Sequence, residues 1–162
     1  MGCEELLKFG AQCREPYDTH TALDIRRLGL DDLELALTLS PLLDGPAKTN
    51  ATRRFLESPI HHLLVAILNG DPVGFVTGVE LTHPDKGTEM FLYELAVDDR
   101  FRRRGIGRQL TEALADLARE HGCYGMWVGT DDDNKAALAT YRAAGATSEE
   151  SFVLLNWDFQ TE

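Results

Sequence analysis

Arginine and glycine cluster in one short stretch of the chain. It reads Arg102, Arg103, Arg104, Gly105, Ile106, Gly107. An apolar run precedes it, and a segment with helical periodicity follows. The N-terminus of a helix carries backbone N–H groups without an intrahelical acceptor, and these groups stabilise an anion. Glycine lets a phosphate approach the backbone, and arginine adds charge-assisted hydrogen bonds. The stretch therefore predicts a pyrophosphate site.

Other glycine-rich phosphate motifs fit this stretch less well. A dinucleotide fingerprint needs a glycine where Leu110 stands, and the P-loop pattern G-x-x-x-x-G-K-[ST] is absent. The pattern [Q/R]-x-x-G-x-[G/A] is matched by Arg102, Gly105 and Gly107. A merely solvated arginine loop is the alternative, but the strand before it and the amphipathic helix after it favour a binding site.

A carboxylate interrupts the apolar run that leads into this turn. Glu94 lies in the sequence F-L-Y-E-L-A-V, which ends at Val97. A charged side chain in an apolar strand marks a candidate for chemistry. The alternative is a structural or surface-facing glutamate, since side chains alternate along a strand.

A second set of polar residues lies further along the chain. Tyr141 follows Asn134 by seven residues, which places both on one face of a helix after about two turns. The alternatives are a buried aromatic residue for Tyr141 and a helix N-cap for Asn134. An acidic loop, Asp131, Asp132 and Asp133, directly precedes this helix and is either a ligand for a cation or a solvated turn.

The elements that must position these residues follow from periodicity and turn signals. We predict strands and helices in this order: strand 22–28, helix 31–40, helix 49–57, strands 61–68, 73–81 and 89–97, helix 105–121, strand 124–130, helix 134–143 and strand 151–159. An antiparallel meander followed by a crossover unit gives an α/β (α+β) mixed sheet, mostly antiparallel and flanked by helices. We expect one domain at 21–162 after a flexible extension at 1–20.

Composition limits the classes of partner. The chain has 162 residues with 27 acidic and 16 basic side chains, a net charge of −11. This charge disfavours nucleic acid and suits a cationic ligand. No apolar run is long enough to span a membrane, and the N-terminus lacks the basic stretch of a secretory signal. We therefore expect a cytoplasmic protein without a membrane partner or a metal. Its three cysteines, at positions 3, 13 and 123, are expected to be reduced thiols.

The turn resembles the acetyl-CoA-binding motif of the GNAT superfamily of N-acetyltransferases. The second motif of that family is matched by Asn134-x-x-Ala137-x-x-x-Tyr141-x-x-x-Gly145, and the resemblance covers roughly 23–159. It implies the GNAT fold and acetyl-CoA as acetyl donor. The implied donor-binding residues are Leu95, Ala96, Val97, Arg102, Arg103, Arg104, Gly105, Ile106, Gly107, Arg108, Asn134 and Ala137. Two departures are Ala146, where the family often has Phe, and Arg108, where a smaller residue is common.

The resemblance also implies roles for the two catalytic candidates. Glu94 corresponds to a carboxylate that family members use as general base or as amine ligand, and we assign it the role of base, directly or through water. Tyr141 corresponds to the hydroxyl that protonates the departing thiolate. The loop amides would hold the pyrophosphate, and the strand backbone at Leu95 and Val97 would pair with pantetheine. We expect direct transfer in a ternary complex, with an N–H near Val97 stabilising the oxyanion.

The acceptor is implied by a narrower resemblance. Y-E-L-A-V, the acidic loop and the following helix look like aminoglycoside 3-N-acetyltransferases, which acetylate a 3-amino group. The candidate acceptor ligands are Glu80, Tyr93, Asp131, Asp132 and Asp133. A polyamine, an amino acid or a protein amine remains an alternative acceptor, and a non-catalytic acyl-CoA sensor an alternative function. The apolar C-terminal strand, which ends at Trp157-Asp158-Phe159, is a candidate for pairing in a homodimer.

Overall fold

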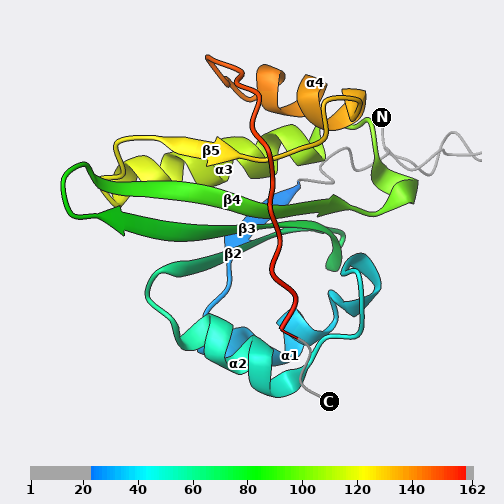
Figure 1. Cartoon of the computed structure of the whole chain (residues 1–162). Coiled ribbons are helices and arrows are strands. Elements are labelled where there is room, and N and C mark those ends of the chain that lie inside the picture. The colour runs from blue at the N-terminus through cyan, green and yellow to red at the C-terminus, as the bar shows by residue number, and fades with distance from the viewer. Residues whose placement is uncertain (1–22, 160–162) are drawn as a thin grey trace, which may run out of the picture.

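A computed structural model describes residues 23–159. Five strands form one sheet in the order β1-β2-β3-β4-β5, with helices on both faces (Figure 1). The strands are β1 (Asp24–Arg27), β2 (His61–Leu68), β3 (Asp71–His83), β4 (Gly87–Val97) and β5 (Met126–Val128). The helices are α1 (Leu33–Leu37), α2 (Thr49–Glu57), α3 (Ile106–Glu120) and α4 (Lys135–Ala143). Three short 3₁₀ turns are η2 (Leu30–Asp32), η3 (Ser40–Leu42) and η4 (Asp99–Phe101). The predicted mixed sheet flanked by helices is confirmed.

Strand pairing changes direction once along the sheet. β1 to β4 pair in antiparallel fashion, and β5 pairs with β4 in parallel after the α3 crossover. The hairpin between β2 and β3 turns at Asn69 and Gly70, whose φ angles are 56° and 88°. Two consecutive positive φ angles are typical of the turn that matches the twist of two antiparallel strands.

Two apolar clusters cover the two faces of the sheet. On one face α3 packs its apolar stripe, including Leu110 and Leu114, against Val76 and Leu92 of the sheet. On the other face the segment with α1 and α2 packs against Phe75 and its neighbours. Strand alternation produces this division because adjacent side chains point to opposite faces.

A β-bulge in β4 interrupts that alternation. Thr77 of β3 faces Glu94, but the next residue, Gly78, faces Leu92, so Tyr93 is the extra residue. A bulge shifts the phase of the strand by one residue. Across Tyr93, the alternation of side chains between the two faces of the sheet is therefore shifted by one residue. The alternation of backbone N–H and C=O groups between the two edges of β4 is shifted in the same way.

The predicted strand at 151–159 is wrong. These residues have no regular secondary structure, and Phe152, Trp157 and Phe159 are 64%, 73% and 88% exposed. The segment runs from the α4 side of the sheet toward α1 and α2 (Figure 1). Its apolar pattern predicts a strand locally, but a strand also needs a paired edge, and within residues 23–159 these residues pair with none.

Two other boundaries differ from prediction. The strand predicted at 124–130 is reduced to Met126–Val128, and the helix predicted at 31–40 is divided into η2, α1 and η3. The N-terminal extension and two of the three cysteines lie outside the described residues. None of the helices in 23–159 is long and apolar enough to cross a membrane.

Candidate active site

The second half of β4 has an open edge. β5 pairs only with Met90, Phe91 and Leu92, so within residues 23–159 no strand covers the edge of β4 beyond Leu92. Asp98 N–H donates to Val73 O at 2.9 Å, toward β3. Backbone groups alternate between the two edges of an antiparallel strand. The N–H and C=O groups of Leu95 and Val97 therefore point to the open edge. An extended ligand can pair there with both groups of Leu95 and with the N–H of Val97, while Val97 O accepts from Arg102 Nε.

The turn after β4 presents a helix N-terminus beside this edge. Gly105 is the N-cap of α3 with φ 79°, and Arg103 also has a positive φ, 58°. The left-handed conformation suits glycine, and it turns the chain sharply into the helix. The first N–H groups of α3 have no intrahelical acceptor, so they form an anion site next to the open edge.

The arginine side chains around this turn mostly contact the protein itself. Arg102 Nε donates to Val97 O at 3.1 Å, and its guanidinium lies 2.7 Å from Asp99. Arg104 lies over the ring of Phe101, 5.2 Å from its centroid. Arg102 thus holds the turn against the end of β4.

The neighbouring arginines behave in the same way. Arg100 is paired with Asp98, and the Arg100 hydrogen bonds lower the pKa of the Asp98 carboxyl to about 2. Arg108 forms an i,i+4 pair with Glu112 at 3.4 Å. Arg103 is exposed in the turn. The basic segment therefore includes structural ion pairs that the sequence pattern alone does not reveal.

Helix α4 closes the site on the side of α3. A Cβ added to Gly107 would lie 3.4 Å from Thr140 Cγ2 and 3.7 Å from Val97 Cγ2, so glycine allows α3, α4 and β4 to meet. Asn134 is the N-cap of α4, with its Oδ1 accepting from Ala137 N–H at 3.1 Å. The structure thus supports the N-cap alternative for Asn134, while its side-chain NH₂ group remains a donor.

Glu94 and Thr77 face each other at a pocket on the α1–α2 side of the sheet. The pocket measures about 330 Å³, and its lining includes Glu94, Tyr93 and Thr77. Burial raises the pKa of the Glu94 carboxyl, and the nearby carboxylate of Asp44 raises it further. A carboxylate of raised pKa in a pocket is suited to taking a proton.

Tyr141 approaches from the other side of the site. It packs against the apolar cluster on the α3 face of the sheet, and burial raises the pKa of its hydroxyl. The phenol is therefore protonated at neutral pH and can serve as a proton donor. The structure supports the packing alternative for the Tyr141 ring, and the acid role of its hydroxyl stays a prediction.

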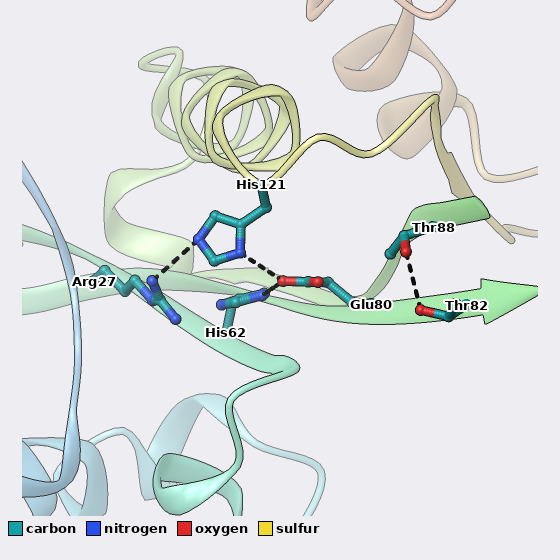
Figure 2. A network of polar contacts seen from close by, with 6 residues as sticks. All are labelled: Arg27, His62, Glu80, Thr82, Thr88 and His121. Atoms are coloured by element: carbon teal, nitrogen blue, oxygen red, sulfur yellow. Dashed lines mark hydrogen bonds and ion pairs between the residues drawn. The ribbon is translucent and has the colours of Figure 1, made fainter.

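Glu80 lies on the opposite face of the sheet from Glu94. Its Oε1 accepts from His62 Nε2 and from His121 Nδ1, each at 2.7 Å, and Arg27 lies 3.5 Å from the other ring nitrogen of His121 (Figure 2). The structure does not bring this residue to the pocket. The network instead joins the C-terminal end of α3 to β2 and β3.

The network also has residue types that bind metal ions. The candidate ligand atoms of His62, Glu80 and His121 lie within 4.8 Å of one another. A carboxylate only accepts hydrogen bonds, so both imidazole nitrogens that face it carry protons. These hydrogen bonds satisfy Glu80 Oε1, while Nδ1 of His62 is buried without a hydrogen-bond partner among the described residues. Sequence reasoning missed this network, because residues 62, 80 and 121 share no motif spacing.

The acidic loop is exposed and lies apart from the pocket lining. Asp131, Asp132 and Asp133 are all exposed, and none of them is among the residues that line the Glu94 pocket. Tyr93 lines that pocket but is 68% exposed, as expected for a bulged residue. Of the predicted acceptor ligands, only Tyr93 reaches the pocket.

This geometry agrees with the family that the sequence matches. The model of the acetyltransferase (GNAT) family matches residues 30–146, from the first 3₁₀ turn to the loop after α4. The chain belongs to the GNAT acetyltransferase family. The match includes β4, the arginine–glycine turn and α4, which together form the site.

Relatives within the GNAT family act on different amines. The chain is 35% identical over 100 residues to a thialysine N-epsilon-acetyltransferase of Bos taurus, covering 57% of this chain and 59% of that protein. It is 37% identical over 102 residues to N-alpha-acetyltransferase RimI of Mycobacterium tuberculosis, covering 63% and 62%. The matches thus span about three fifths of the length of these relatives.

A solved GNAT structure matches over more of the chain. The aminoglycoside acetyltransferase meta-AAC0020, from an uncultured soil metagenomic sample and in complex with trehalose, superimposes with a TM-score of 0.79. It is 26% identical and covers 85% of this chain and 97% of its own. The fold is thus shared with an aminoglycoside acetyltransferase of solved structure.

Proposed function

We propose that this chain is an acetyl-CoA-dependent N-acetyltransferase that acts on a primary amine. One observation carries the proposal. The bulge at Tyr93 points the Glu94 side chain toward a pocket. It also points the backbone groups of Leu95 and Val97 toward the open edge of β4, beside the N-terminus of α3. A candidate base, an open strand edge for an extended ligand and a helix N-terminus suited to phosphate are thus adjacent.

The donor would bind along the open edge. The amides at the start of α3 suit the pyrophosphate of acetyl-CoA, and Leu95 and Val97 suit its pantetheine arm. The side-chain NH₂ of Asn134 is a further donor at the α4 side. These assignments rest on the exposed backbone groups and on the family motif.

The chemistry needs one base and one acid. Glu94 would take a proton from the ammonium or from the attacking amine, directly or through water. The amine nitrogen forms a bond to the thioester carbonyl carbon, an N–H near Val97 stabilises the oxyanion, and the carbon–sulfur bond then breaks. Tyr141 gives its proton to the leaving thiolate. Cys123 has a pKa raised by burial and by Glu80, so a covalent acetyl-cysteine is not part of the scheme.

The acceptor that the resemblance favours is the 3-amino group of an aminoglycoside. The net charge of −11 and the likeness to an aminoglycoside acetyltransferase support it. A polyamine, an amino acid or a protein amine is the second candidate, supported by relatives that are named for other amines. A cytoplasmic location is part of the same proposal.

Thiol release from acetyl-CoA tests the proposal. Purified protein is assayed with gentamicin, spermidine and a lysine peptide, and each product is mapped by mass spectrometry. Turnover with any amine supports the acetyltransferase, and acetylation of the 3-amine supports the aminoglycoside assignment. Acetyl-CoA binding without turnover on any amine would instead support a sensor.

A further inference from the structure

The pocket beside Glu94 has an apolar wall. Nine of its fourteen lining residues are alanine, leucine, proline or phenylalanine. Leu39, Phe55, Leu63 and Phe75 belong to the apolar cluster on this face of the sheet. Binding to a surface of this kind is favourable when an apolar group of the ligand displaces water from it.

Two of the five polar or charged residues that line the pocket lie side by side in the sheet. Thr77 is 8% exposed, lies directly across from Glu94 in the register of β3 and β4, and its Oγ1 has no hydrogen-bond partner. A buried hydroxyl without a partner costs free energy until a ligand satisfies it. The Glu94 carboxylate can hold one ammonium or amine group, and the Thr77 hydroxyl across from it is buried.

The charges around the pocket do not match a polycation. Among the residues that line it, Glu94 carries the single negative charge and Lys48 carries a positive one. Asp44 adds a carboxylate close enough to affect the pKa of Glu94. Each further ammonium of a polyamine would enter the pocket beside apolar side chains or Lys48, which is unfavourable. One amine with an uncharged body fits better.

We propose that the acceptor is a primary monoamine with a compact apolar body, such as an arylalkylamine. The amine lies against Glu94, and the apolar body lies against the wall formed by Leu39, Phe55 and Phe75. This inference rests on the proposed function, because it names the acceptor of the same transfer. It selects the less charged acceptors over aminoglycosides and polyamines.

Competing acceptors test the inference by turnover. We expect kcat/KM for 2-phenylethylamine to exceed that for spermidine and for gentamicin by at least about tenfold, since one unpaired ammonium in an apolar site costs more than that factor. A higher kcat/KM for gentamicin or spermidine would overturn the acceptor class and leave the acetyltransferase intact.

Direct binding separates this inference from the proposed function. Calorimetry with protein saturated with CoA measures binding of 2-phenylethylamine and spermidine without any reaction. Binding of 2-phenylethylamine that is weakened in Glu94→Gln supports the pocket assignment even if turnover fails. Absence of that binding, or tighter binding of spermidine, overturns it.

Two variants probe the wall and the rim. Ala51→Phe fills the pocket from α2 and should raise KM for 2-phenylethylamine about tenfold, with KM for acetyl-CoA unchanged.

Lys48→Glu should raise kcat/KM for spermidine, relative to kcat/KM for 2-phenylethylamine, by about tenfold. Lys86→Glu is the matched control, because Lys86 is exposed in the turn between β3 and β4 and does not line the pocket. An equal effect of Lys86→Glu would show that net charge, and not the pocket, sets the preference.

Discussion

Glu94 has two properties that are not expected of a residue with a purely structural role. It lies in a pocket that raises its pKa, and it faces a hydroxyl without a partner. A folded protein gains nothing from a carboxylate that is harder to ionise than in water. The position therefore favours a role of Glu94 in chemistry over a role in stability.

We expect Glu94→Gln to lower kcat by about 10²–10⁴-fold, the usual contribution of a general base. The KM for acetyl-CoA should stay unchanged, since the donor track lies at the open edge. In the wild type, kcat/KM should rise with pH as the carboxylate ionises through its raised pKa, and this limb should vanish in the variant. Glu89→Gln, on the same strand and bonded to Tyr124, is the control. Equal activity of both variants at every pH would remove Glu94 from the base role.

The same substitution should stabilise the protein at pH 7. A carboxyl whose folded pKa is raised binds its proton more tightly in the folded chain, so stability is lost as pH rises through that pKa. Gln does not ionise, so the variant does not lose stability in this way as the pH rises. Thermal unfolding should therefore show a higher Tm for Glu94→Gln than for wild type at pH 7 and a smaller difference at pH 4. A lower Tm at pH 7 would contradict the raised pKa.

Tyr141→Phe keeps the packed ring and removes the hydroxyl. We expect kcat to fall by about 10²-fold or more, with acetyl-CoA affinity retained, because the thiolate then leaves without a proton donor. Tyr124→Phe is the matched control, since Tyr124 is exposed and bonded to Glu89. The measurement is steady-state turnover with calorimetric acetyl-CoA binding for both variants. Unchanged kcat in Tyr141→Phe would assign proton donation to another group.

At the scale of elements, the contact between β3 and α3 sets the spacing of the site. A Cβ on Gly78 would lie 2.7 Å from Leu114 Cδ1 and 2.8 Å from Met90 Sδ. We expect Gly78→Ala to lower the free energy of unfolding by about 1–3 kcal/mol, as overpacking does. Gly125→Ala, where nothing lies within 4 Å of the added Cβ, should change it by less than about 1 kcal/mol. Urea unfolding of both variants is the test, and equal stability would contradict the tight contact.

At the scale of the whole molecule, the network in Figure 2 couples stability to pH. Burial lowers the pKa of His62, against the hydrogen bond to Glu80. Burial would raise the pKa of Glu80, but the hydrogen bonds from His62 and His121 outweigh it and lower the pKa. Both shifts make the unfolded chain bind more protons than the folded chain in acid.

Stability should therefore fall as pH decreases below the ordinary histidine value, about 6.5, and fall again below about 4.5. Thermal unfolding between pH 7.5 and 4 measures this. His62→Gln should flatten the first part of the decrease, whereas His83→Asn, at an exposed histidine next to Asp85, should not. An unchanged slope in His62→Gln would show that other groups cause the acid sensitivity.

The homodimer inferred from the C-terminal segment stays a prediction. Phe152, Val153, Leu154, Leu155, Trp157 and Phe159 are 64–88% exposed. A contiguous apolar segment of this kind is typical of an interface. We expect light scattering to give a dimer for the wild type and a monomer for a Leu155→Glu, Trp157→Glu double variant. A monomeric wild type would contradict the interface.

The sequence by itself determined the order of elements, the turn and the family. The apolar run before Arg102, the glycines at 105 and 107 and the periodicity of α3 are local features, and local features fix strand, turn and helix. The same features predicted the phosphate site, because a helix N-terminus binds anions wherever it occurs. The prediction of a C-terminal strand is wrong because a strand must pair with the edge of another strand. A local apolar pattern does not show whether such an edge is present.

Only the tertiary structure decided which side chains share a site. The bulge at Tyr93 depends on the register between β3 and β4, and it alone places Glu94 opposite Thr77 in a pocket. The sequence offered Glu80 and the acidic loop as ligands for the acceptor that Glu94 would deprotonate. The sheet separates them, because a strand sends alternate side chains to opposite faces and the loop lies outside the pocket wall. Residue type is a property of the sequence, whereas proximity is a property of the packed sheet.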